Sequence, residues 1–197
     1  MTQRHPFEWL SPVAQKRAFP ALLIFTLAVQ VGMGVLDVPL GTEVSPLGIV
    51  SFEFAGNLSF AKTILEAWGP AGQVYAGLSL GLDYLFLVAY ASCIALGCAL
   101  VARGFSTWAP SLSTVGVFLS WTQGGAAVLD AVENFALIQL LLGSERAIWP
   151  AVAKWCAIPK FLIVAVGLVY MCGGAVAVVA AYRRADPGAR TRSGDDA

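Results

Sequence analysis

Asp130, Glu133 and Asn134 stand at positions i, i+3 and i+4, a spacing that places all three on one face of a helix. Gln123 lies one heptad earlier on the same face. Two carboxyl groups held close together in an apolar setting can act as general acid and general base, carry a proton, or bind a cation. We therefore take this face as the centre of any chemistry in the chain.

Partners for this face come from the other charges that interrupt or flank long apolar stretches. Each charge near the centre of a membrane costs about 2.5 to 3.5 kcal/mol on insertion scales, so such residues are expected to face the interior of a bundle. Glu53 and Glu66, from a separate segment, are positioned to close the cluster from the outer side. No catalytic residue is assigned, and the predicted ligand- or ion-binding residues are Asp83, Asp130, Glu133, Asn134, Lys160 and Glu53.

The surplus of acids over bases decides how this cluster is interpreted. A purely structural role, in which Lys160 pairs with one carboxylate and Asn134 bridges two helices, needs only one acid. An unpaired buried carboxylate must instead be protonated, bind a cation or contact a polar ligand. The sequence favours a functional cavity and leaves the structural role open. Nearby aromatic residues could line a ligand pocket, but packing in the bundle or against lipid is favoured for each of them: Tyr84, Phe86, Tyr90 and Phe135.

Residue content excludes several chemistries. The single histidine, His5, stands near the start of the chain, so histidine-ligated haem, zinc or copper sites and a Ser-His hydrolase are not expected. The four cysteines form no Cys-x-x-Cys pair and are expected to be packing residues, and there is no phosphate-binding Gly-x-x-x-x-Gly-Lys loop. We expect no cofactor, no metal site and, without a basic stripe, no nucleic-acid partner.

Four charge-free stretches must position the cluster, and they span residues 18–36, 84–102, 104–129 and 161–182. Each can cross a bilayer, which takes about 20 apolar residues in a helix. Composition agrees, because 58% of the residues are hydrophobic and only 12% are charged, against roughly a quarter charged in soluble proteins. The prediction is an all-α integral membrane protein, an up-down four-helix bundle with an external amphipathic or re-entrant helix.

The predicted organisation has three parts. Residues 19–182 form the transmembrane domain, residues 1–18 a cytoplasmic segment with an interfacial helix that begins at Ser11-Pro12, and residues 183–197 a disordered cytoplasmic tail. Lysine and arginine gather near both termini and at Arg103, in a turn that runs to Pro110. Because cytoplasmic segments are enriched in these residues, both termini are predicted to be cytoplasmic.

Residues 49–69 form the longest piece outside the spans. Asn57 or Ser59 is expected to cap a helix that stops at Gly69-Pro70. Its apolar face is expected from Phe60, Ile64, Ala67 and Trp68. The following Gly77 and Gly81 form a small-xxx-small pattern that predicts a close helix crossing, although glycine is frequent enough here for the pattern to arise by chance.

The segments Phe52-Glu53-Phe54-Ala55, Asp83-Tyr84-Leu85-Phe86 and Asp130-x-x-Glu133-Asn134 resemble motifs of small, uncharacterised bacterial four-span integral membrane proteins. The resemblance covers about residues 19–182. It implies a multi-pass protein of the inner (plasma) membrane and no particular substrate.

Three functions remain open, all with membrane lipids as surroundings. The first is an outer-facing acidic cavity that binds or translocates a proton, a cation or an amphipathic small molecule. The second is an accessory subunit that packs against a larger membrane-protein partner. The third is an enzyme acting on a lipid or isoprenoid, with Asp130 and Glu133 as acid and base and Asp83 stabilising a cationic transition state.

Overall fold

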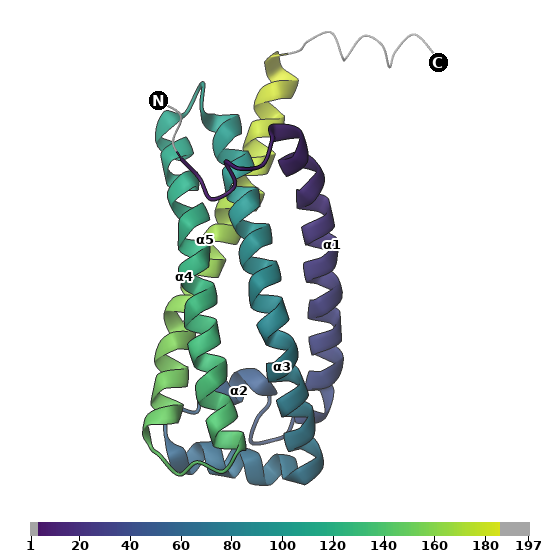
Figure 1. The fold of residues 1–197 in the computed structure, drawn as a ribbon, viewed down its shortest axis with the longest axis vertical. Coiled ribbons are helices and arrows are strands. Elements are labelled where there is room, and N and C mark those ends of the chain that lie inside the picture. Colours follow the sequence, from purple (N-terminus) through teal and green to yellow (C-terminus); the bar gives the residue numbers. More distant parts are fainter. Residues whose placement is uncertain (1–3, 186–197) are drawn as a thin grey trace, which may run out of the picture.

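A computed structural model, which describes residues 4–185, is built almost entirely of helices and contains no strand in that range (Figure 1). Two short helices connect the first two of the four long ones. In chain order the helices are α1 (Pro12–Asp37), η1 (Val38–Leu40), α2 (Ile49–Glu53), α3 (Leu58–Phe105), α4 (Pro110–Leu141) and α5 (Ile148–Ala185). The predicted all-α four-helix bundle is confirmed.

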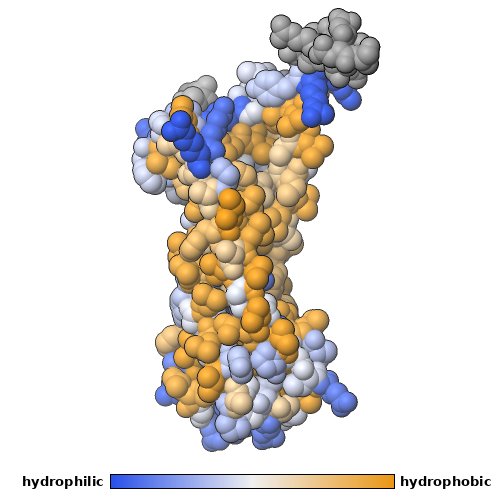
Figure 2. Space-filling view, turned by 90° about the vertical axis from the view of Figure 1, so that its right-hand side faces the viewer, coloured by the Kyte–Doolittle hydropathy of each residue, from blue (hydrophilic) through white to orange (hydrophobic). Residues whose placement is uncertain are grey.

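All four long helices are long and apolar enough to cross a membrane. Figure 2, which faces α1, shows an apolar belt between two more hydrophilic ends. The helices are longer than the predicted spans, and α5, with 38 residues, is about 57 Å long against a hydrocarbon core of about 30 Å. The helix ends therefore extend beyond the belt. Because four of its helices can each cross the bilayer, this is a multi-pass membrane protein.

The two ends of the bundle differ in what they carry. We call the end where α1 begins and α5 ends the terminal end. The turn between α3 and α4 also lies there (Figure 1). At the opposite, loop end lie η1, α2 and the α4–α5 connection. Helix α3 continues to Phe105, so the turn that was expected from Arg103 is confined to residues 106–109. Residues 183–185, expected in a disordered tail, belong to α5, and the rest of that predicted tail lies outside the described residues.

No separate interfacial helix precedes the first span. The Ser11 hydroxyl accepts a hydrogen bond from Ala14 N and caps α1, which then runs through Pro20 to Asp37 without a break. Residues 12–18 are thus part of α1. Proline is tolerated inside membrane helices because neighbouring groups can satisfy the freed carbonyl, so Pro20 does not end the helix.

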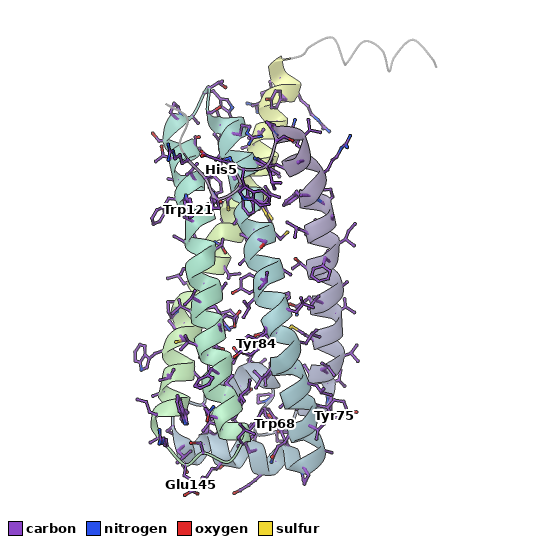
Figure 3. All side chains as sticks on the ribbon, in the orientation of Figure 1. His5, Trp68, Tyr75, Tyr84, Trp121 and Glu145 are labelled. Carbon is purple, nitrogen blue, oxygen red and sulfur yellow. The ribbon has the colours of Figure 1, made fainter. Side chains whose placement is uncertain are left out.

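The segment before α1 is fixed across the terminal end by a buried glutamine. Gln15 Nε2 donates hydrogen bonds to Phe7 O and Leu10 O, and Arg103 Nη2 donates to Gln15 Oε1 at 2.6 Å. Trp121 and His5, both labelled in Figure 3, lie at this end of the bundle. The chain before α1 is therefore bonded to α1 through Gln15, and the same side chain bonds α1 to α3.

The predicted helix outside the spans is present, and it lies across the loop end as the first part of α3 (Figure 1). Asn57 caps it through Phe60 N, and Gly69, with φ +60°, breaks the helical geometry as predicted. Its buried face is different from the expected one. Ala61, Ile64 and Trp68 are buried, whereas Phe60 and Ala67 are exposed. Ile64 and Trp68 were thus expected correctly and Phe60 and Ala67 were not, because the helix packs on the bundle end at an angle that its own periodicity does not specify.

The close helix crossing predicted at Gly77 and Gly81 is wrong. A Cβ atom added at either glycine would have no atom within 4 Å. The helices approach closely elsewhere, between α3 and α5. At Gly97 an added Cβ would collide with Met171 of α5, and at Gly174 it would collide with side chains of α3. Small residues at these two positions let the helix backbones approach.

Candidate functional site

The structure brings all six predicted site residues together. They come from four helices, α2, α3, α4 and α5, and each residue is buried, with 7% or less of its surface exposed. We name this group the polar cluster: Glu53, Asp83, Asp130, Glu133, Asn134 and Lys160.

Helix α4 supplies three members of the cluster from one face, as the i, i+3, i+4 spacing predicted. Asp130, Glu133 and Asn134 all point into the bundle, and Gln123 is fully buried on the same face one heptad away. Gln123 Nε2 donates to the carbonyls of Leu119 and, on α5, of Ile163, so this part of the face does connect helices. The polar face of α4 therefore serves packing at Gln123 and forms a charged group further along.

Lys160 of α5 is the only basic residue in the cluster. Its Nζ donates to Asp130 Oδ1 at 3.0 Å and lies 2.8 Å from Glu133 Oε2. The same ammonium is 3.9 Å from Glu53 Oε2, too far for a hydrogen bond. One cation thus faces three carboxylates, and two of them take its close contacts.

Asp83 of α3 is held by a different neighbour. Asn134 Nδ2 donates to Asp83 Oδ2 at 2.6 Å. Tyr90, one heptad further along α3, donates its hydroxyl hydrogen to Asp130 Oδ2 at 2.9 Å. Packing was the favoured expectation for Tyr90, and its heptad spacing from Asp83 indicates that it shares the face of that acid.

The other aromatic residues near the cluster divide between two environments. Phe86 lines the cavity described below, against expectation. Tyr84 is partly exposed and donates to Ala131 O at 3.3 Å. Phe135 is exposed and packs edge-on against Trp149, as a packing residue would.

Glu53 reaches the cluster from α2, the short helix at the loop end. Asp37 Oδ1 accepts a hydrogen bond from Ile49 N at 2.7 Å, which ties the start of α2 to the end of α1. Burial raises the pKa of Glu53 well above its ordinary 4.5, and Lys160 opposes this only in part, since Glu133 and Asp130 raise the pKa further. Glu66, also expected near the cluster, is exposed on α3 and takes no part in it.

The cluster lies at one level, toward the loop end. Asp130 is about 17 Å along α4 from Leu141, and Lys160 is about 18 Å along α5 from Ile148. Asp83 is about 20 Å along α3 from Pro70. Tyr84, next to Asp83 in the chain, lies in this half of the bundle in Figure 3. Because Asp83, Asp130 and Lys160 each adjoin a charge-free stretch, the cluster marks the loop-end border of the apolar belt.

A cavity of about 470 Å³ adjoins the cluster. Glu53, Asp83, Asp130 and Lys160 line it, together with Tyr90. Its remaining walls are mostly apolar side chains of α1, α3 and α5 that continue from the cluster into the belt, among them Leu23, Leu27, Ile94, Val164, Leu168 and Met171. The cavity therefore has a charged end and an apolar end.

The hydrogen bonds of the cluster are unbalanced toward acceptors. Glu53 Oε2, Glu133 Oε1 and Asn134 Oδ1 are buried and have no donor among the described residues. A buried acceptor without a donor costs about 1 to 3 kcal/mol, more if it is charged. What the cluster lacks is therefore a donor or a positive charge. Among the described residues no group of three His, Cys, Asp or Glu is arranged to hold a metal ion.

No protein-family model, curated protein or solved structure matches this chain.

Proposed function

We propose that this membrane protein uses its acidic cavity, open toward the outer side, to bind or translocate a proton, a cation or an amphipathic small molecule. One observation carries the proposal. Glu53 lines the cavity, is 7% exposed, and its Oε2 has no hydrogen-bond donor within residues 4–185. A carboxyl group in that position is neutralised either by a proton or by a cation that enters the cavity.

The distribution of charge supports an outer-facing cavity. Within residues 4–185 the terminal end carries Arg4, Lys16, Arg17, Arg103, Arg183 and Arg184, and the loop end carries Lys62, Arg146 and Lys154. By the positive-inside tendency the terminal end is cytoplasmic, so the cluster lies in the outer half of the membrane. We place the protein in a bacterial inner membrane because its motifs resemble those of small bacterial four-span membrane proteins. The charge distribution places both termini on the cytoplasmic side.

The proposal is tested on full-length protein reconstituted in liposomes and nanodiscs. The probes are protons, Na⁺, K⁺, butylamine and tetradecylamine, with flux measured in liposomes and binding in nanodiscs. At least one probe should bind saturably or move across the liposome membrane, and Asp130→Asn should abolish that signal.

Two further variants make the result interpretable. Asp83→Asn removes a second cluster carboxylate, in case Asp130→Asn disturbs folding, and should also abolish the signal. Glu66→Gln removes an exposed carboxylate on α3 and should leave it unchanged. If no probe is bound or moved at pH 6 or pH 8, or if both cluster variants behave like Glu66→Gln, the proposed function is wrong.

A further inference from the structure

The shape of the cavity specifies more about its ligand than its charge alone. From the polar cluster into the belt, the lining continues along α3 from Asp83 to Ile94 and along α5 from Lys160 to Met171, about 17 Å in each case. Toward the loop end the α3 lining also includes Ser79 and Leu80. One leaflet of a bilayer core is about 15 Å thick. The apolar part of the cavity thus has the length of one leaflet of lipid chains, beginning at the level of the polar cluster.

The volume limits how much can enter. At roughly 30 Å³ for each water-sized group, 470 Å³ holds about 16 such groups. That is enough for one hydrocarbon chain with a small head group and too little for a lipid with two long chains.

The cavity also opens sideways. Helix α1 packs along α3 and has no comparable contact with α4 or α5 within the described residues. Cavity-lining residues on the facing sides of α1 and α5 are exposed at the surface, namely Leu27, Phe161 and Leu168. These residues belong to the apolar belt, so the opening between α1 and α5 faces lipid rather than water.

The charged side chains that line one end of the cavity indicate which head group its ligand carries. Glu53, Asp83 and Asp130 line the cavity against the single cation Lys160, whose close contacts are with Asp130 and Glu133. Glu53 is more than nine-tenths buried, and its Oε2 lacks a donor in the part of the chain that the structure describes. An ammonium group supplies both of the things missing here, a positive charge and several N–H donors.

We infer that the ligand is a single-chain amphiphile with a protonated amine head group, which enters from the outer leaflet between α1 and α5. Its ammonium binds among Glu53, Asp83 and Asp130, and its chain lies along the apolar walls. This inference rests on the proposed function and narrows it to one ligand class and one route of entry.

The test uses radiolabelled tetradecylamine and full-length protein in phosphatidylcholine nanodiscs, with empty nanodiscs as the background. Tetradecylamine should bind saturably, with one molecule for each protein. Tetradecanol, which has the same chain without the charge, should compete at least about tenfold less well, since a hydrogen bond to a charged group contributes about 1.5 to 3 kcal/mol. Glu53→Gln should weaken tetradecylamine binding and reduce its advantage over tetradecanol.

The route of entry is tested by a matched pair of substitutions on α1. Leu27 and Ile24 are both exposed and one turn apart, but only Leu27 lines the cavity. Leu27→Trp should weaken tetradecylamine binding about tenfold, because the larger side chain fills part of the space that the alkyl chain would occupy. Ile24→Trp should leave binding unchanged.

Each outcome is informative. If tetradecylamine binds but Leu27→Trp and Ile24→Trp behave alike, or if tetradecanol competes equally well, this inference is overturned and cation binding at the cluster remains. If only protons, Na⁺, K⁺ or butylamine are bound or moved, the amphiphile is also excluded while the proposed function stands. If no probe interacts at all, both are rejected.

Discussion

Replacing Lys160 by methionine tests whether the polar cluster is a buried ionic group. The substitution removes an ammonium that lies 2.8 Å from Glu133 Oε2 and 3.0 Å from Asp130 Oδ1, and it keeps the length and apolar stem of the side chain. At least one carboxylate is then buried without a cation. Breaking a buried ion pair in this way costs about 3 to 5 kcal/mol. For a chain of this size that corresponds to a fall in Tm of about 6 °C or more.

Unfolding can be followed through the thiols of the protein. Cys93 and Cys98 are buried, so their reaction with a maleimide dye in detergent reports the loss of tertiary structure. Lys154→Met is the matched control, since Lys154 is a partly exposed lysine on the same helix and makes none of these contacts. Its Tm should remain within about 2 °C of the native protein, as expected for a substitution away from buried features.

A double variant separates ionic coupling from lost packing. In Lys160→Met/Glu133→Gln the carboxylate that lost its partner is also neutral, so the double variant should be less destabilised than the sum of the two single variants, by about 0.5 to 3 kcal/mol. The reasoning is refuted if Lys160→Met melts at pH 8 within about 1 °C of Lys154→Met. It is also refuted if the two substitutions simply add.

Three further predictions concern stability, each measured by the same thiol assay. Because the pKa of Glu53 is raised in the folded state, its contribution to stability is full below pH 4.5 and is lost as the pH rises through the folded pKa. The free energy of unfolding of Glu53→Gln should therefore rise relative to that of the native protein above pH 4.5, by up to about 1.4 kcal/mol for each pH unit, and its Tm should rise with it. A difference in Tm that does not depend on pH would contradict the burial of an acid there. Gly174→Leu should destabilise by about 1 to 3 kcal/mol, because its side chain would collide with α3, while Gly173→Leu, with open space around it, should not; equal effects would show that no close crossing exists. Trp68→Phe removes the N–H that donates to Leu40 O at 2.8 Å and to Ser45 Oγ at 2.9 Å. The free energy of unfolding should fall by about 1 to 3 kcal/mol. An unchanged Tm would mean that this contact does not stabilise the loop end.

The amphiphile experiments extend these tests from stability to ligand binding. Stability measurements establish whether the carboxylates are buried and coupled, and tetradecylamine binding establishes what the surplus of carboxylates serves. A cluster that is ionic but binds nothing would match the structural role that the sequence left open.

Much of the site could be predicted from residue spacing. The i, i+3, i+4 pattern of Asp130, Glu133 and Asn134 fixes their common face, since helix geometry is local. The cost of a charge in lipid then turns that face inward, toward the other intramembrane charges Asp83 and Lys160. Glu53 was included in the predicted site as a residue that would close it from above. Glu66 was expected beside it on the same reasoning, although not among the predicted site residues, and it is exposed.

The errors have one cause, which is that local patterns do not specify how helices are placed against one another. Gly77 and Gly81 have the small-xxx-small spacing and yet face open space, while Gly97 and Gly174 face each other's helices without any such motif. The interfacial helix expected before Pro20 is part of α1, because the bundle accommodates a proline inside a membrane helix.

The sequence by itself determined that four apolar helices cross a membrane, and that charges at the borders of those helices must turn inward, because both follow from the cost of placing polar groups in hydrocarbon. Only the tertiary structure decided that one ammonium takes its close contacts with Asp130 and Glu133, and that among the described residues Glu53 Oε2 is left without a donor. It also decided that α1 packs along α3 rather than α5, beside a cavity that side chains of all three helices line. These features depend on distances between side chains far apart in the chain. No spacing within a single helix encodes them, since they arise when the helices pack.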